Sequence, residues 1–118
     1  MDIEIFELER IQSVWENHVE FNLTESGVHP YTLNELLGRD ELAALANLRL
    51  GYGQTNGSIA LREAIAALYP GATADNVLVT NGSAEANFVA TWCALEPGDE
   101  MLYMVPNYLQ IGGVAGSM

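Results

Sequence analysis

The sequence predicts an α/β fold, and two features of its hydrophobic pattern indicate it. Residues 77–80 and 101–105 are short apolar runs, of the kind expected for strands that are covered on both faces. Residues 83–95 lie between them, are apolar over helical length, and follow directly on Gly82. A strand, a helix and a second strand form a βαβ unit, whose crossover is expected to be right-handed.

Before this unit, the chain is expected to open with an amphipathic helix over residues 6–19. Apolar residues recur there at helical spacing, and polar residues occupy the other side. The apolar positions are Leu8, Ile11, Trp15 and Val19. Residues 22–30 follow without a sustained period, so we expect an ordered loop that ends at Pro30.

Two helices are predicted next. Thr32 and Glu35 have the spacing of a capping box, which predicts a short helix to residue 37 that Gly38 ends. A second helix is expected over residues 40–48.

A glycine-rich loop over residues 51–57 then leads to a helix that Ser58 caps. Its apolar face consists of Leu61, Ile65 and Leu68. Pro70 and Gly71 end this helix.

The helix over residues 83–95 has few polar interruptions, so most of its circumference is expected to be buried. Cys93 lies on this helix, and we expect it to fill space in the core, because a nucleophile needs a neighbouring base and some exposure. As the single cysteine, Cys93 also excludes an internal disulfide.

The composition excludes several classes of protein. Of the 118 residues, 49% are hydrophobic and 17% are charged, which excludes an intrinsically disordered chain. Sixteen acidic residues against four arginines give a net charge of −12, and the chain contains no lysine. Such an acidic surface repels nucleic acid and anionic membranes, so neither is expected as a partner.

We expect a soluble protein in a reducing, cytoplasmic compartment. The sequence opens with acidic residues, whereas a signal peptide opens with basic ones. The longest uncharged stretch, residues 101–118, contains Pro106 and several glycines and does not suit a membrane-spanning helix.

The strongest chemical signal is the turn at residues 80–84, where a predicted strand meets a helix. Backbone N–H groups at a helix N-terminus are unpaired, and the helix dipole is positive there. Gly82 would allow close approach of a ligand and Ser83 adds a hydroxyl, so the turn can hold a phosphate without a basic side chain. The alternative is an ordinary turn in which Gly82 relieves strain and Ser83 caps the helix.

Tyr108 is a second candidate ligand contact. It lies beyond the carboxyl end of the second predicted strand, which is the edge where open α/β sheets bind ligands. The alternative is an aromatic side chain that packs onto the helix that follows.

Other motifs point away from nucleotide and metal sites. The loop at residues 51–57 does not fit G-x-G-x-x-G, because its third glycine comes one residue late and it follows a helix. A Walker P-loop would need a lysine. His18 and His29 have no second ligand at metal-binding spacing, so no metal site is expected. Glu25 is expected to be a solvated carboxylate.

Three segments, in this order and spacing, carry a resemblance to a known family. They are Tyr52 and Gly57 with residues 61–65, residues 75–86, and residues 95–99 followed by residues 106–108. Together they resemble the N-terminal part of the class I/II aminotransferases, fold type I enzymes that use pyridoxal 5′-phosphate (PLP). The resemblance covers roughly residues 20–112.

The resemblance implies specific roles in cofactor binding. The backbone N–H groups of Ser83 and Ala84, with the Ser83 hydroxyl and Gly82, would bind the PLP phosphate. Tyr108 matches an aromatic residue that stacks on the pyridine ring. Tyr52 matches a tyrosine that reaches across a dimer interface to the phosphate of the neighbouring subunit's cofactor.

The resemblance also implies a substrate loop, but no catalytic residue in this chain. Ser26 and Gly27 lie in a loop that resembles the segment which closes over the substrate. In the family, three catalytic or binding residues lie downstream of Tyr108: the lysine that binds PLP covalently and transfers a proton, the Asp beside the pyridine nitrogen, and the Arg that binds the substrate carboxylate. This chain has no lysine anywhere.

On this resemblance, the chain is the first part of the aminotransferase large domain. Residues 1–31 would form the N-terminal helix and the substrate-loop segment, and residues 32–118 a partial PLP-binding domain. The two predicted strands are not neighbours in the family's sheet, so we expect an incomplete sheet and a marginally stable or partly molten chain. Residues 111–118 contain three glycines and are expected to depart from the family's usual helix.

The function expected from the resemblance is that of the N-terminal segment of an aminotransferase. The complete protein would move an amino group between an amino acid and a 2-oxo acid, as a homodimer, and this chain alone would be inactive. One alternative is a non-catalytic remnant that binds phosphate or PLP. Another is part of a PLP-dependent lyase or synthase of the same superfamily, because these enzymes share the phosphate turn and the stacking aromatic.

Overall fold

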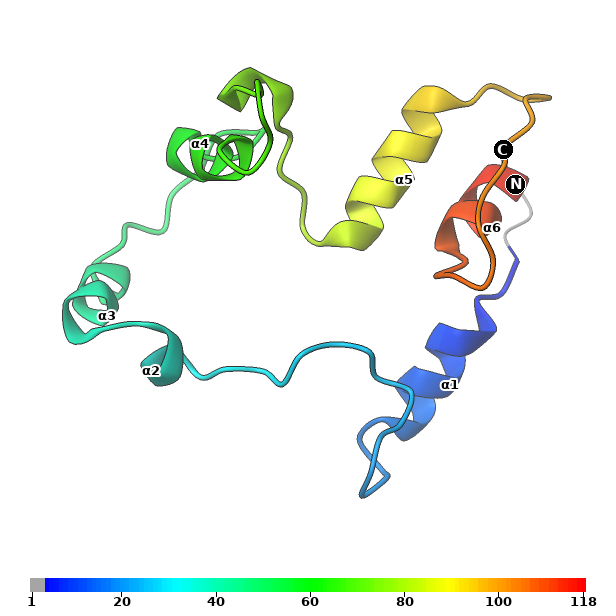
Figure 1. The fold of residues 1–118 in the computed structure, drawn as a ribbon. Helices are drawn as coiled ribbons and strands as arrows, with labels where there is room; N and C mark the ends of the chain where they lie inside the picture. The colour runs from blue at the N-terminus through cyan, green and yellow to red at the C-terminus, as the bar shows by residue number, and fades with distance from the viewer. Residues whose placement is uncertain (1–3) are drawn as a thin grey trace. The chain divides into compact units, whose positions relative to one another are not determined.

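The computed structural model describes residues 4–118, and this part of the chain divides into two compact units. The first unit contains residues 4–19 and 54–118, and the second contains residues 20–53. The elements of the first unit are α1 (Glu7–Trp15), α4 (Ile59–Ala66), the 3₁₀ helix η1 (Ala74–Asn76), α5 (Ser83–Ala94) and α6 (Gln110–Gly116) (Figure 1). The second unit contains α2 (Leu33–Leu36) and α3 (Arg39–Ala46).

The two predicted strands do not pair within residues 4–118, where no strand forms. A strand exists only when its backbone groups bond to a neighbouring strand, and neither segment has such a neighbour here. The helix of the predicted βαβ unit is confirmed as α5. The strands and the sheet stay a prediction.

In the second unit, the capping box is confirmed. The Thr32 N–H donates to Glu35 Oε2 at 2.8 Å, and the Glu35 N–H donates back to Thr32 Oγ1 at 3.3 Å. These bonds from Thr32 hold the pKa of the Glu35 carboxyl below its usual value. α2 ends at Leu36 with Leu37 as its C-cap, one residue before the predicted end, and Gly38 is the N-cap of α3, where its N–H donates to Glu41 Oε2 at 2.7 Å.

The helix after the glycine-rich loop is also confirmed as α4. Ser58 Oγ accepts a hydrogen bond from the Leu61 N–H at 3.3 Å, as its capping position predicts. The 3₁₀ helix η1 was not predicted. Its cap is the pair of bonds from Thr73 to Asn76 Oδ1, and η1 packs against α4.

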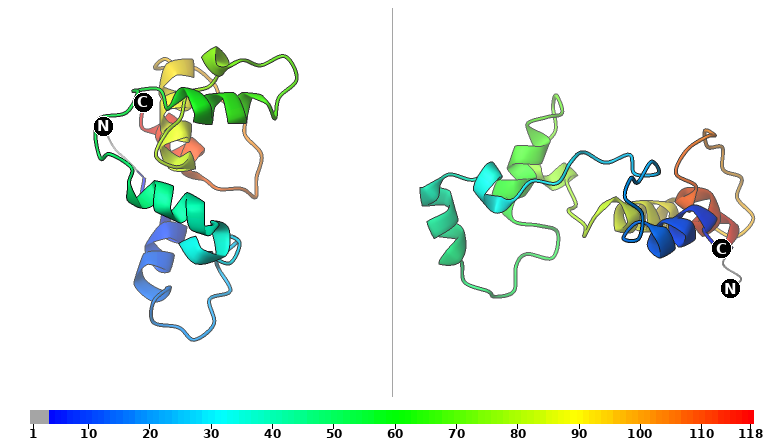
Figure 2. Two further views of the ribbon diagram at one scale, coloured as in Figure 1. Left: turned by 90° about the vertical axis from the view of Figure 1, so that its left-hand side faces the viewer. Right: turned by 90° about the horizontal axis from the view of Figure 1, so that it is seen from below.

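The prediction that most of α5 is buried is wrong. Within this helix only Thr91 is buried, whereas Phe88 and Trp92 are 47% and 48% exposed and stack on each other at 5.6 Å. Cys93 is likewise exposed and fills no core. α6 packs against α5 (Figure 2), and a helix whose main partner is a single short helix leaves the rest of its surface open.

The expected loss of helix near the C-terminal end of the described chain is wrong as well. Residues Gln110–Gly116 form α6 despite their glycines. A Cβ at Gly112 would lie 2.7 Å from the hydroxyl oxygen of Tyr103, so this glycine makes room for an aromatic ring. At Gly112 this packing acts against the roughly 1 kcal/mol that a helical glycine costs relative to alanine, whereas Gly113 and Gly116 have no such neighbour.

Little apolar surface is buried in either unit. Ala66, at 4% exposed, is the one buried apolar residue among residues 4–118, whereas Leu23, Leu50 and Leu102 are 93%, 97% and 102% exposed. Each buried Leu would contribute about 1.5–3 kcal/mol, so this exposure favours the expectation of a marginally stable chain. None of the helices in the described residues is long and apolar enough to cross a membrane.

Candidate functional site

The candidate phosphate turn lies at the start of α5. Gly82 has φ of 87°, and no atom lies within 4 Å of the place where a Cβ would stand, so the turn is open on that side. The Thr80 hydroxyl donates to the Gly82 carbonyl at 2.9 Å, and the Gly82 N–H donates to the Thr80 carbonyl at 3.0 Å. These two local bonds fix the shape of the turn.

Ser83 and Ala84 are the first two residues of α5, and both are exposed. At these positions no preceding helical carbonyl can accept the backbone N–H, so both groups can donate to an acceptor outside the helix. The N-cap position belongs to Gly82, with no side-chain capping bond. The alternative expectation, in which Ser83 caps the helix, is therefore wrong.

Glu85 is a feature of this turn that the sequence did not reveal. Its Oε2 accepts a hydrogen bond from the Asn81 N–H at 2.6 Å. A carboxylate in the first turn stabilises the helix through its interaction with the helix dipole. Its hydrogen bond also restrains the backbone at Asn81. The same charge repels anions, so it opposes the attraction of the helix dipole for a phosphate.

Tyr108 packs onto α1, which neither expectation for it included. Its hydroxyl donates to Glu9 Oε1 at 2.9 Å, and its ring meets Phe6 edge-on at 4.9 Å between centroids. Burial, followed by the hydrogen bond and the charge of Glu9, raises the pKa of Tyr108 above its usual value. In this arrangement its hydroxyl is already engaged within the chain.

Gln110 brings the segment after Tyr108 against the beginning of α5. Its Nε2 donates to the Ala84 carbonyl at 3.0 Å, and its Oε1 accepts from Asn87 Nδ2 at 3.2 Å. The structure therefore places the two candidate cofactor segments beside each other. No sequence signal singled out Gln110, because a polar residue at the start of a helix is common.

The remaining candidates, Ser26, Gly27 and Tyr52, lie in the second unit, and all three are exposed. The Gly27 N–H donates to Glu25 Oε1 at 2.6 Å, so Glu25 closes a local turn instead of being only a solvated carboxylate. These residues are described within their own unit, and their roles stay predictions.

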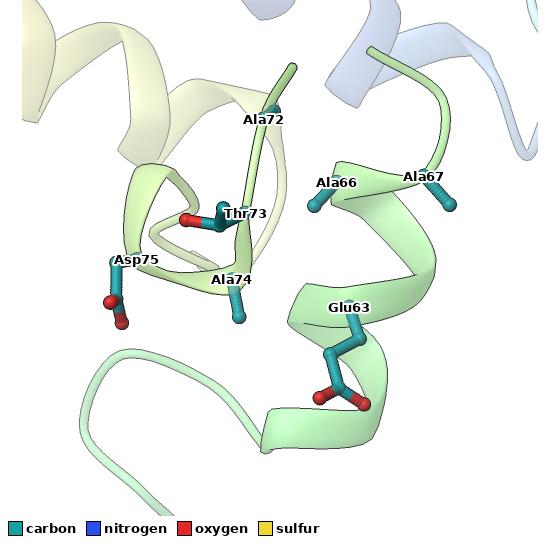
Figure 3. Close-up of a pocket in the computed structure, with 7 residues that line it drawn as sticks. All are labelled: Glu63, Ala66, Ala67, Ala72, Thr73, Ala74 and Asp75. Atoms are coloured by element: carbon teal, nitrogen blue, oxygen red, sulfur yellow. The ribbon is translucent and has the colours of Figure 1, made fainter. Parts of the chain in front are cut away.

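A pocket of about 470 Å³ lies between α4 and η1 (Figure 3). Its lining carries the carboxylates of Glu63 and Asp75 among small Ala and Thr side chains. Two carboxylates and no cation do not suit a phosphate, so this pocket is separate in chemistry from the candidate turn.

Arg62 is the buried charge of the first unit, and sequence reasoning did not single it out beyond its place in a motif. Its Nε donates to the Gly57 carbonyl at 3.1 Å and its Nη1 to the Ala74 carbonyl at 2.7 Å. Asp75 lies 4.0 Å away, with its side chain 97% exposed. Hydrogen bonds to a charged donor contribute about 1.5–3 kcal/mol, against about 0–1 kcal/mol for an exposed ion pair, so the carbonyl bonds dominate.

These residues fit one end of PLP. The open side of Gly82 and the exposed N–H groups of Ser83 and Ala84 suit its phosphate. The aldehyde of PLP would need a lysine to bond to, and the sequence contains none. The chain can therefore supply phosphate contacts, but no lysine for a covalent bond to the cofactor.

Comparison with protein families decides the relationship: the family of class I and II aminotransferases matches residues 22–116. The chain belongs to this family. Membership implies the fold of PLP-dependent transferases, and the family generally depends on PLP. The resemblance identified from the motifs is thus confirmed.

Two curated relatives show where this chain falls in longer proteins. It is 34% identical over 98 residues to capreomycidine synthase of Streptomyces vinaceus, a match that covers 80% of this chain and 25% of that protein. It is 37% identical over 60 residues to histidinol-phosphate aminotransferase 2 of Carboxydothermus hydrogenoformans, which covers 51% of this chain and 16% of the relative. The chain thus spans a quarter or less of either relative. No solved structure gives a significant match.

Proposed function

We propose that this chain supplies the phosphate-binding part of a PLP-dependent aminotransferase. The observation that supports the proposal is the open turn at Gly82, which stands at the start of α5 and within the residues that the family matches. The complete protein would transfer an amino group between an amino acid and a 2-oxo acid, and would be a cytoplasmic homodimer.

The residues of this chain would bind and orient the cofactor. The N–H groups of Ser83 and Ala84 and the Ser83 hydroxyl would donate to the phosphate, while Gly82 leaves space for it. The Tyr108 ring would lie against the pyridine, and Tyr52 would reach the phosphate held by a second subunit. When bound, PLP withdraws electrons from the α-carbon of the substrate, which is the chemistry that amino transfer requires.

Ser26 and Gly27 would cover the substrate and exclude water from it. The lysine that completes the reaction is not among the residues of this chain. The chain by itself is therefore proposed to bind PLP reversibly and to transfer no amino group.

A second candidate function is part of a PLP-dependent synthase. It is favoured by the match to capreomycidine synthase, which covers more of this chain than the match to the aminotransferase does. In the whole protein, formation of a 2-oxo acid from the amino donor would indicate transfer. A product formed without a 2-oxo acid would indicate a synthase.

The phosphate contact is tested by titrating the isotopically labelled 118-residue chain with PLP, inorganic phosphate and pyridoxal. We expect PLP and phosphate to shift the amide resonances of Ser83 and Ala84, and pyridoxal, which lacks the phosphate, to leave them in place. Equal shifts with pyridoxal, or no shifts at all, would contradict the proposal.

Two variants of Ser83 separate the backbone donor from the hydroxyl. Ser83→Ala removes only the hydroxyl, whereas Ser83→Pro also removes the N–H at a first helical position, which tolerates proline. We expect Ser83→Pro to bind PLP roughly tenfold more weakly than Ser83→Ala, because a charge-assisted hydrogen bond is lost. Leu33→Pro, at the first position of α2, is the matched control and should leave PLP binding unchanged.

A further inference from the structure

Arg62 is a buried charged residue of α4, close in the chain to the loop that precedes this helix. It is 5% exposed, and within the described chain only Ala66 and Thr91 share this degree of burial. A buried guanidinium is retained only where its donors have acceptors, and two of its donors bond to main-chain carbonyls. The role of Arg62 therefore depends on the segments to which these two carbonyls belong.

The two carbonyls belong to two segments next to residues 77–80: one precedes them directly in the chain, and the other is hydrogen-bonded to Val79 through Asn56. Ala74 begins η1, and this short helix ends at Asn76, directly before Val77. Gly57 follows Asn56, whose carbonyl accepts a hydrogen bond from the Val79 N–H at 3.1 Å. The guanidinium therefore links the segment that precedes Val77 to the loop that runs beside Val79.

Gly57 brings that loop into direct contact with Val79. Its φ is 97°, and a Cβ at this position would lie 2.5 Å from Val79 Cγ2. Such a distance is shorter than real Cβ contacts, so the loop main chain occupies space that only a glycine leaves free. The Arg62 bond to the Gly57 carbonyl thus holds the loop against Val79.

From Val79 the chain reaches Ser83 through three residues whose shape is fixed locally. Thr80 and Gly82 exchange two hydrogen bonds, and the Asn81 N–H bonds to Glu85 of α5. A displacement of Val79 would therefore be passed on to the start of α5.

We propose that Arg62 is a positioning residue for the phosphate turn. Its guanidinium bonds to both the Gly57 and the Ala74 carbonyls and so fixes the position of residues 77–80. This segment leads into the turn where the N–H groups of Ser83 and Ala84 would meet a phosphate. This inference rests on the proposed function, since it concerns the same turn. Arg62 itself bonds to main-chain carbonyls and donates nothing to the phosphate.

The test compares Arg62→Gln with Arg49→Gln in the labelled 118-residue chain. Both variants lose one positive charge, but Arg49 is exposed. In Arg62→Gln we expect the Val79 amide to exchange with solvent roughly tenfold faster or more, because its backbone bond to Asn56 is no longer held. We also expect the PLP-induced shifts of Ser83 and Ala84 to shrink together, and Arg49→Gln to match the wild type in both measurements.

Two further variants separate position from charge. Arg62→Lys keeps the positive charge but lacks the planar fork that spans two carbonyls, so we expect it to recover only part of the PLP response. Asp75→Asn removes the distant ion pair and leaves both carbonyl bonds, so it should behave like the wild type. Full recovery in Arg62→Lys would overturn the inference in favour of a plain charge effect.

The wild-type chain provides an independent measurement if Arg62→Gln does not fold. We expect the Arg62 Nε–H resonance to exchange slowly, and to be protected together with the Val79 amide. An Arg62 Nε–H that exchanges as fast as that of Arg49 would overturn the inference. Helical content from circular dichroism and the Asn87–Gln110 side-chain contact show whether α5 and α6 are intact in each variant.

The two proposals fail in different measurements. Wild-type amides of Ser83 and Ala84 that do not respond to PLP would refute the proposed function. Unchanged Val79 exchange in a folded Arg62→Gln chain would refute the positioning role, whatever the result with PLP.

Discussion

The two segments that the sequence predicts as strands differ sharply in their surroundings. In residues 77–80, Val79 is half-buried, bonds to the Asn56 carbonyl and lies against Gly57. In residues 101–105, Leu102 and Met104 are 102% and 72% exposed. Within residues 4–118, no backbone group of this second segment bonds to another backbone group.

The difference teaches that an apolar run becomes partly buried and hydrogen-bonded when another segment of the chain packs against it. The first segment has a loop beside it and Arg62, which ties that loop to η1. In the second segment the Tyr103 ring packs on α6 at Gly112, and the contacts of Tyr108 follow it. Both have the same hydrophobic pattern, so pattern alone does not decide the outcome.

The largest expected effect comes from Gly57→Ala, which should break the contact between the first segment and the loop beside it. The new Cβ would overlap Val79, and φ of 97° disfavours any side chain, so we expect a local loss of about 2–4 kcal/mol. Hydrogen exchange of the Val79 amide measures it. Gly71→Ala is the matched control: φ is 82° with open space around it, so it carries the conformational cost of about 1 kcal/mol without the overlap.

A smaller effect should distinguish the two segments directly. Val79→Ala removes half-buried methyl groups and should destabilise the first unit by about 1 kcal/mol. Leu102→Ala removes a side chain that is fully exposed, so we expect a change within about 0.5 kcal/mol. Urea unfolding followed by circular dichroism measures both variants, and equal losses would contradict the comparison.

The smallest effect should come from Tyr108→Phe, which removes the hydrogen bond that follows the second segment. The contact with Phe6 is kept, so we expect a loss of about 0.5–1 kcal/mol. The pKa of Tyr108 is raised in the folded chain, so this contribution is complete below pH of about 10 and is lost as pH rises through the raised value. Titration of tyrosine absorbance measures this pKa: the late-titrating tyrosine of the wild type should be missing from Tyr108→Phe. It should be kept in the control Tyr31→Phe, which removes an exposed tyrosine.

The helices could be predicted from the sequence because their signals are local. The Thr32–Glu35 capping box, the Ser58 cap and the start of α5 after Gly82 each depend on residues within one turn. Burial could not be predicted in the same way. The surface of α5 is apolar, yet its exposure depends on how much of it another element covers, and α6 is short.

In the candidate site, too, local features could be predicted from the sequence and long-range contacts could not. The open turn at Gly82 follows from one glycine and a helix start, and the sequence predicted both. The roles of Arg62 and Tyr108 depend on partners far along the chain: Arg62 bonds to a carbonyl twelve residues away, and Tyr108 to Glu9. No spacing rule contains such pairings, so they became visible only in the fold.

Gly112 and Gly113 are adjacent in α6, yet they are not equivalent. The Tyr103 ring touches the main chain at the first, while nothing lies within 4 Å of the second. Among related sequences, a larger residue at 113 is therefore compatible with the helix as it stands. At 112 a side chain would overlap the end of the Tyr103 ring, so it requires that ring to move aside or a smaller residue at 103, and substitutions at these two positions should depend on each other.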